Sequence, residues 1–409
     1  MDKLVPIFLS DALIGILTKD ANGTLIFKYD SKYLENKDAV PLSCSLPLQK
    51  QEYYGSSAHT FFVGLLPEES ELKQIAQSIG TDTSNSFRLL QEIGKECIGA
   101  VRVGGTSKQS TAKYKLITKQ EWDILVQNNL QRVSYLYKEK DQRLSLAGAQ
   151  SKMGALYQNG QYSFAIEGSP TNCIVKFPSD YFPNMTENEF VTMSLAKSLG
   201  IDVPNIDLVK LGGKNCFSIS RFDRITQEGD ILRIHQEDFC QALGILPQNK
   251  YEQDNGPSFS MCIQLIRKVC SVPVIEINKF IGIYIFNLLI GNRDAHGKNF
   301  SLIFNEGQVC LAPAYDLICT AFYNELSDNM AMKIHNQYDD EFLTLENFKT
   351  ELSTSNISYK QFYEKVTNQI TLLEKKLVDI YTLHTDHEFV KQYIDLIKKR
   401  LIHFKNIFH

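Results

Sequence analysis

The chain has 409 residues, of which 43% are hydrophobic and 22% are charged, and this ordinary globular composition excludes a largely disordered protein. Lys and Arg number 43 against 47 Asp and Glu, and the net charge of −4 argues against a general nucleic-acid-binding protein, whose affinity depends on excess cationic side chains. A chain of this length predicts two or three domains.

Cysteine spacing and the N-terminal sequence indicate the compartment. The 9 cysteines are scattered, no two are spaced as in a zinc knuckle, and their odd number argues against a disulfide framework. Reduced thiols of a cytoplasmic protein fit better. Acidic residues flank the short apolar stretch at the N-terminus, which is therefore a poor signal peptide. The longest uncharged apolar run, 281–292, is shorter than the ~20 residues that cross a bilayer, so no membrane contact is expected.

Residues 1–105 predict a small α+β module. Two strands, at 11–17 and 24–29, flank an Asp-Ala-Asn-Gly turn, and Asn-Gly between apolar runs strongly favours a hairpin. Helices are predicted around 61–66 and 69–79. The polar, glycine- and serine-rich stretch 104–113 has no periodicity and predicts a linker.

A sheet-rich lobe is predicted over 106–228 and a helical lobe over 229–409. The first contains a helix at 187–199 and short strands at 143–145, 153–156, 162–166, 173–177, 206–211 and 216–220. In the second, apolar side chains from Ile277 to Leu289 recur with helical spacing, and those from Val390 to Phe408 repeat the pattern.

The strongest chemical pattern follows the helix predicted to end near residue 289. The spacing Asp294-x-x-x-x-Asn299 matches a protein-kinase catalytic loop, where the Asp accepts the proton of the substrate hydroxyl and the Asn holds a metal ion. Asp316, beyond a hairpin-like stretch, stands where the main Mg²⁺ ligand is needed, and Mg²⁺ prefers such oxygen ligands. The alternative is a capped helix end followed by ordinary polar loop residues.

A kinase also needs a lysine for the phosphates, a glutamate to orient it and a flexible loop. Lys176 lies inside an apolar strand, where an unpaired charge is costly, and Glu189 in the next helix is its candidate partner. The alternative is a surface strand lysine. The small-residue loop 146–152 could present backbone N–H groups to phosphates, although an ordinary turn is the default interpretation. Ser145, just before it, is an available phosphate acceptor.

Several motifs together resemble the HipA family of toxin serine/threonine kinases, in order and spacing, over residues 1–325. The motifs in the N-terminal module are Pro-Leu-Ser-Cys-Ser-Leu-Pro-Leu (41–48), Gly-Leu-Leu-Pro-Glu (64–68) and Glu-Ile-Gly-Lys-Glu-Cys-Ile-Gly-Ala-Val (92–101). Those beyond it are Ser-Leu-Ala-Gly-Ala-Gln-Ser-Lys (145–152), Ile-Val-Lys-Phe-Pro (174–178), Arg-Phe-Asp-Arg (221–224), His-Gln-Glu-Asp-Phe-Cys-Gln (235–241), Lys-Tyr-Glu (250–252), Leu-Ile-Gly-Asn-Arg-Asp-Ala-His-Gly-Lys-Asn-Phe-Ser (289–301) and Pro-Ala-Tyr-Asp (313–316).

The resemblance implies an α+β, two-lobed protein-kinase-like fold, with a sheet-rich N-lobe and an all-helical C-lobe, preceded by the small α+β module. It implies ATP and Mg²⁺ as cofactors, with Asp294 as the base, Asn299 and Asp316 as metal ligands, and Glu189 orienting Lys176. The nucleotide-binding residues that it implies are Ala147, Gly148, Ala149, Gln150, Ser151, Lys152, Lys176, Ser220, Arg221, Phe222, His296, Gly297, Lys298, Asn299, Tyr315 and Asp316.

The resemblance also implies a biological role. Ser145 would be an autophosphorylation site whose modification expels the loop and inactivates the kinase. The expected target is an aminoacyl-tRNA synthetase, the glutamate enzyme, so that translation and growth are inhibited. The expected partner is a small helix-turn-helix antitoxin, through which alone the chain would contact DNA. The sequence departs from the family at Ser220, where an acidic residue is usual, and at Ser151, where Glu is usual.

Two other functions stay open at this point. One is a pseudokinase or regulatory module that acts mainly as a co-repressor with the antitoxin, and the other is a small-molecule or lipid kinase. The intact set of Lys176, Asp294, Asn299 and Asp316 argues against the pseudokinase. Comparing protein acceptors with lipid and sugar acceptors would separate a protein kinase from a small-molecule or lipid kinase.

Overall fold

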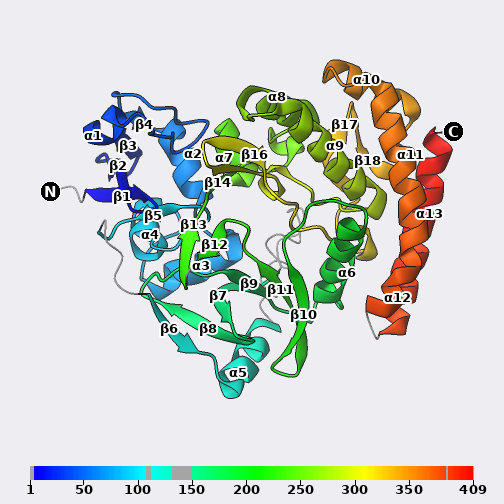
Figure 1. The fold of residues 1–409 in the computed structure, drawn as a ribbon, viewed down its shortest axis with the longest axis horizontal. Helices are drawn as coiled ribbons and strands as arrows, with labels where there is room; N and C mark the ends of the chain where they lie inside the picture. Colours follow the sequence, from blue (N-terminus) through cyan, green and yellow to red (C-terminus); the bar gives the residue numbers. More distant parts are fainter. Residues whose placement is uncertain (1–3, 107–111, 131–149, 228, 384–385, 409) are drawn as a thin grey trace.

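The computed structural model describes residues 4–106, 112–130, 150–227, 229–383 and 386–408. These residues form an N-terminal module, a sheet-rich lobe and a larger C-terminal lobe (Figure 1). The N-terminal module has a hydrophobic core of its own, whereas the core of the C-terminal lobe also includes residues of the sheet-rich lobe, among them Val191 and Phe217. The N-terminal module lies on one side of the molecule and the last helices lie on the other (Figure 1). The expected α+β, two-lobed architecture is confirmed.

In the N-terminal module, helices pack against a five-stranded antiparallel sheet of order β4-β3-β2-β1-β5. The predicted hairpin is confirmed, because β2 and β3 pair and the turn between them uses Gly23 at a φ of +85°. The two predicted helices are also present, although the first starts earlier, because its polar first turn carries no apolar repeat. The elements are β1 (Val5–Leu9), β2 (Ala12–Lys19), β3 (Leu25–Tyr29), α1 (Ser31–Glu35), β4 (Tyr53–Tyr54), α2 (Ser56–Gly64), α3 (Glu69–Ser78), α4 (Ser86–Ile93) and β5 (Val101–Val103).

The sheet-rich lobe is a six-stranded antiparallel sheet of order β10-β11-β9-β7-β8-β6. The strands predicted from residue 153 onward are confirmed, and the strand predicted at 143–145 lies outside the described residues. Lys152 at the start of β7 stands directly across from Lys176 at the end of β9. The elements are β6 (Lys113–Leu116), α5 (Lys119–Leu130), β7 (Lys152–Gln158), β8 (Gln161–Ile166), β9 (Cys173–Lys176), α6 (Met185–Ser198), β10 (Ile206–Leu211) and β11 (Lys214–Ser220).

The hairpin β12 (Arg224–Gln227) and β13 (Asp230–Arg233) leads into the C-terminal lobe, which is mostly but not entirely helical. A three-stranded sheet of β14, β15 and β16 and a hairpin of β17 and β18 correct the expectation of an all-helical lobe. The run at 235–238 is polar and fully buried, so pairing with β15 satisfies its backbone, but no apolar alternation marks it as a strand. The elements are β14 (His235–Asp238), α7 (Phe239–Leu243), α8 (Phe259–Val269), α9 (Pro273–Ile290), β15 (Ser301–Asn305), β16 (Gln308–Leu311), β17 (Asn329–Ile334), β18 (Gln337–Asp339), α10 (Leu345–Thr354), α11 (Tyr359–Lys376), α12 (Ile380–Leu383) and α13 (His387–Phe408).

The central helix of the C-terminal lobe is α9, as its apolar periodicity predicted. Among the described residues it is the one helix long and apolar enough to cross a membrane, but 67% of that stretch is buried inside the protein, as in a core helix. Its end is capped by Gly291 at a φ of +74°, and the buried guanidinium of Arg400 from α13 donates hydrogen bonds to the carbonyls of Leu288 (2.6 Å) and Leu289 (3.2 Å). Arg400 also forms an ion pair with buried Asp340 at 2.6 Å.

We expect Arg400→Ala to lower the free energy of unfolding by about 3–5 kcal/mol, because it leaves buried carbonyls and a buried carboxylate without this partner. Urea unfolding of the full chain measures this change. The control Lys405→Ala removes an exposed ion pair with Glu374 from the same helix and should cost less than about 1 kcal/mol. Equal losses in the two variants would contradict a capping role for Arg400.

Candidate active site

A cleft of about 400 Å³ lies where the three parts of the molecule meet. One region of its wall is apolar, with Ile174, Ile219 and Phe222, and the Phe222 ring lies 5.5 Å from that of Tyr315. The N-terminal module contributes 64–68 and 96–98 to the lining. Both stretches fall in motifs identified in the sequence, but their distance along the chain from the kinase motifs gave no indication that they line the cleft.

The buried ammonium group of Lys176 lies between two carboxylates. Its Nζ is 2.5 Å from Oε1 of Glu189, on α6, and also forms an ion pair with Asp316, which follows β16. Burial alone would lower the pKa of Lys176, but Asp316 and Glu189 raise it above its usual value, so the lysine is charged. The prediction that Glu189 partners Lys176 is matched by this contact.

Two carboxylates share this one cation, and their environments differ. Burial raises the pKa of Glu189 to about 7, although Lys176 opposes the shift. Burial would also raise the pKa of Asp316, but Lys176 and Lys152 hold it below its usual value. Asp316 has a φ of +53°, which is uncommon for a residue other than glycine and is characteristic of functional sites. Asn292 helps to hold this backbone by donating from Nδ2 to the Asp316 carbonyl at 3.2 Å.

The residues of the predicted catalytic loop reach the same place from the end of α9. Asp294 is buried, and its carboxylate accepts a hydrogen bond from the hydroxyl of Tyr251. Tyr251 lies in the Lys-Tyr-Glu motif (250–252), but the sequence assigned it no role in the site. Asn299 Nδ2 donates to the Asp294 carbonyl at 2.9 Å and so closes the loop. A small cavity of about 30 Å³ beside the cleft is lined by Gln150, Lys152, Lys176, Glu189, Asp294, Asn299, Asp316 and Ile318.

The donor set fits a metal ion that shares its coordination with a substrate. Within the described residues, no group of three or more His, Cys, Asp and Glu side chains could hold a metal ion by itself. Asp316 and Asn299 instead offer one carboxylate and one amide oxygen on the same small cavity. Mg²⁺ is typically held by one or two carboxylates and completes its shell with water and phosphate oxygens. These two residues would therefore hold Mg²⁺ only together with a phosphate group.

A short 3₁₀ helix at Gly297–Asn299 contains Lys298, and His296 precedes it as the N-cap residue. The ring of His296 is fully buried, and neither of its nitrogens has a hydrogen-bond partner among the described residues. Burial lowers the pKa of His296 well below its usual value, and Lys250 and Lys298 act in the same direction, so the imidazole is neutral at pH 7. Lys298 lines the cleft, and its Nζ is 3.0 Å from Oδ2 of Asp238.

The predicted hinge residues take different positions. Ser220, Arg221 and Phe222 all line the cleft, but the guanidinium of Arg221 binds Asp223 (2.7 Å) and Glu96 (3.4 Å). Of the predicted loop, Gln150, Ser151 and Lys152 line the cleft. Ser145, Ala147, Gly148 and Ala149 lie outside the described residues.

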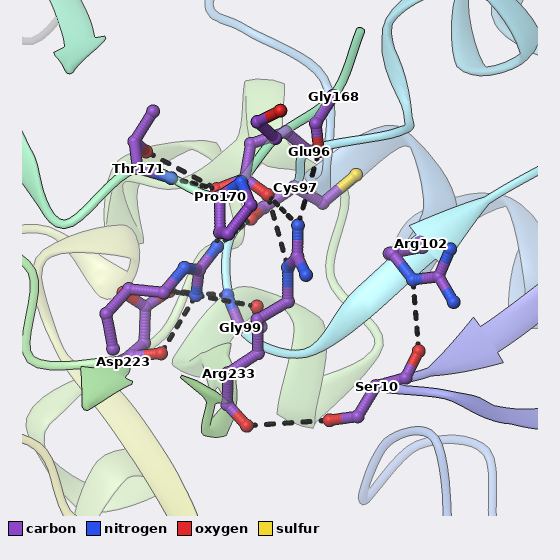
Figure 2. A network of polar contacts seen from close by, with 12 residues as sticks. Ser10, Glu96, Cys97, Gly99, Arg102, Gly168, Pro170, Thr171, Asp223 and Arg233 are labelled. Atoms are coloured by element: carbon purple, nitrogen blue, oxygen red, sulfur yellow. Dashed lines mark hydrogen bonds and ion pairs between the residues drawn. The ribbon is translucent and has the colours of Figure 1, made fainter. Parts of the chain in front are cut away.

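A network of buried charges joins the N-terminal module to this hinge, and Figure 2 shows it around Glu96. The Glu96 carboxylate, between α4 and β5, pairs with Arg224 at 2.9 Å and Arg233 at 2.5 Å, as well as with Arg221. Arg221 and Arg224 also donate to the Cys97 carbonyl. The Arg-Phe-Asp-Arg motif contains two arginines of this network, Arg221 and Arg224, but nothing in the sequence identified Glu96 as their partner.

Comparisons with known proteins follow the same division of the chain. Residues 5–104 match the family model of the HipA N-terminal domain, and residues 144–373 match that of the HipA-like C-terminal domain. The chain belongs to the HipA family. It is 32% identical to the putative kinase Y4mE of Sinorhizobium fredii over 97% of both chains. It is also 32% identical to the serine/threonine-protein kinase toxin HipA of Shewanella oneidensis, over 81% of this chain and 78% of that one.

A solved structure supports the same assignment. The HipA chain in the Shewanella oneidensis complex of HipA, HipB and operator DNA superposes with a TM-score of 0.90, at 27% identity, over 99% of this chain and 98% of that one. The N-terminal module, the lobes and the cleft between them are therefore arranged as in an established HipA fold.

The raised pKa of Glu189 predicts a pH dependence of stability. Because its pKa is about 7 in the folded protein, against an ordinary value of 4.5 for a glutamate in the unfolded chain, the folded protein binds this proton more tightly. The resulting stabilisation is fully present below pH 4.5 and is lost as the pH rises through 7. We expect the melting temperature of Glu189→Gln to fall less than that of the wild type between about pH 5 and pH 8.

Thermal melts of the nucleotide-free protein at a series of pH values measure this slope. The matched control is Glu374→Gln, at an exposed glutamate, which should follow the wild-type slope. Parallel slopes for wild type and Glu189→Gln would show that Glu189 does not bind the proton.

Proposed function

We propose that this HipA-family chain is an ATP-dependent serine/threonine protein kinase and acts as the toxin of a toxin–antitoxin pair. The observation that carries the proposal is the convergence of Lys176, Glu189, Asp294, Asn299 and Asp316 on one small cavity beside the cleft. Such a set can neutralise phosphates, hold a metal ion and accept a proton, which together are the requirements of phosphoryl transfer.

Each part of the cleft suits one part of ATP. The apolar wall at Ile174, Ile219 and Phe222 suits the adenine ring, and Lys176 and Lys152 suit the phosphates. Mg²⁺ held by Asp316 and Asn299 would supply positive charge to the phosphates. The acceptor hydroxyl oxygen forms a bond to the γ-phosphorus while the bond to the ADP oxygen breaks, and Asp294 takes the hydroxyl proton.

The acceptor, partner and location extend the proposal. The acceptor is a serine or threonine of an aminoacyl-tRNA synthetase, with the glutamate enzyme first, so that phosphorylation inhibits translation in the cytoplasm. The partner is a helix-turn-helix antitoxin that contacts DNA, and the Shewanella oneidensis complex of HipA, HipB and operator DNA supports this choice. We divide the chain into an N-terminal module at 1–105, a linker and N-lobe at 106–228, and a C-lobe at 229–409. The separate core of the N-terminal module supports the first boundary.

We expect Asp294→Ala and Asp316→Asn each to reduce phosphate transfer to the purified synthetase at least a hundredfold, because one removes the proton acceptor and the other a metal ligand. Thermal melts should show both variants folded. The matched control Asp379→Asn alters an exposed aspartate paired with Lys376 and should keep wild-type activity. Full activity in Asp316→Asn would overturn the assignment. Transfer to lipid or sugar acceptors in place of protein would redirect it to a small-molecule kinase.

We also expect Ser145 to become phosphorylated and the kinase then to lose activity. A phosphate adds about −1.5 to −2 charges beside a loop that contacts ATP phosphates, so repulsion should disfavour the closed loop. Intact-mass spectrometry after incubation with Mg²⁺ and ATP should show one added phosphate, mapped to Ser145, while activity falls in step. Phosphate at another residue, or normal turnover by the modified protein, would contradict the switch but not the kinase.

A further inference from the structure

The segment 250–252, between α7 and α8, contacts the N-terminal module, the predicted catalytic loop and β17. Lys250 Nζ forms an ion pair with Glu68 of the N-terminal module at 2.8 Å. Tyr251 donates its hydroxyl hydrogen bond to Oδ1 of Asp294. Glu252 Oε2 accepts from the backbone N–H of Lys333, on β17, at 2.9 Å. We infer that Tyr251 is a positioning residue, which fixes the carboxylate of Asp294 for phosphoryl transfer. This inference rests on the proposed function.

The Tyr251 side chain is held firmly enough for this role. It is 6% exposed, and its ring meets the buried ring of His296 edge to face, with the centroids 5.1 Å apart. The backbone is fixed on both sides, because Gly297 N donates to the Lys250 carbonyl (3.2 Å) and Gly256 N donates to the Tyr251 carbonyl (2.9 Å). The hydrogen bond from Gly297 thus binds the segment to the proposed catalytic loop next to the phenol.

The hydrogen bond from Tyr251 restricts the rotation of the Asp294 carboxylate about its terminal torsion. The terminal torsion of Asp is broad, so the backbone alone does not set the plane of its carboxylate. The backbone of Asp294 is already fixed, since its N–H donates to Asn292 Oδ1 (3.2 Å) and its carbonyl accepts from Asn299. A charge-assisted bond to Oδ1 then sets the plane of the group that lines the small cavity. Misplacing a reacting group by about 1 Å can cost a factor of 10² in rate.

A purely structural role is the competing explanation, because a buried tyrosine hydroxyl needs a partner wherever it lies. The two explanations differ in what they predict for turnover. If Tyr251 only fills space, the loss of its hydroxyl lowers stability and leaves the rate constant unchanged. If it positions Asp294, kcat falls while ATP binding does not, because Tyr251 does not line the cleft in which ATP is proposed to bind.

The test compares Tyr251→Phe with wild type in full-length protein, using ATP, Mg²⁺ and the purified glutamate synthetase. We expect kcat to fall at least tenfold, with the Kd for ATP, measured by calorimetry, within twofold of wild type. The matched control is Tyr33→Phe, in which a buried tyrosine of the N-terminal module loses its hydrogen bond to the Val40 carbonyl (2.8 Å) and kcat should not change. In an Asp294→Ala background, Tyr251→Phe should have no further effect.

A second pair of variants keeps the volume of the hydroxyl and remains decisive if Tyr251→Phe does not fold. 4-Aminophenylalanine at position 251 retains a hydrogen-bond donor and should restore kcat, whereas 4-methylphenylalanine lacks the donor and should not. Equal kcat in these two variants, an unchanged kcat in Tyr251→Phe, or a further loss in the Asp294→Ala background would each overturn the inference. If the wild type transfers no phosphate to any protein, the proposed function fails and the inference fails with it.

Discussion

The buried ammonium group of Lys176 joins the sheet-rich lobe to the cleft residues of the C-terminal lobe. A buried cation is costly unless it is paired, and Glu189 and Asp316 together offset the burial of Lys176 at the end of β9. One of these carboxylates comes from α6 and the other from the segment after β16. Burial is the main cause of the raised pKa of Glu189, and the neighbouring carboxylate of Asp316 adds to it, whereas Lys176 and Lys152 keep the pKa of Asp316 low.

Local patterns predicted the part of the site that depends on short sequence distances. The spacing of Asp294 and Asn299 and the helix before them were sufficient to predict that these two residues lie close together, because both belong to one loop that follows the end of the helix. Lys176 and Glu189 are 13 residues apart, across one strand end and one helix start, and their pairing was also predicted. Tyr251 and Asp294 are 43 residues apart on different segments, and no periodicity connects them.

The remaining features required the tertiary structure. The strand at 235–238 was missed because its side chains are polar although buried, and polar side chains usually indicate a surface. Glu68 and Glu96 were missed because their partners lie 182 and up to 137 residues away. A charged residue in a loop has an ordinary surface interpretation, and only the packing of the module against the hinge shows that these two carboxylates are parts of the cleft wall.

The network around Glu96 also bears on how the protein is made. The N-terminal module leaves the ribosome first, but Arg233, one of the partners of Glu96, is synthesised 137 residues later. At about 5–20 residues per second, this interval is roughly 7–27 s. During this time the Glu96 carboxylate lacks Arg233 as a partner. The lining of the cleft extends as far along the chain as Asp316, so the nascent chain has no complete cleft until that residue has emerged.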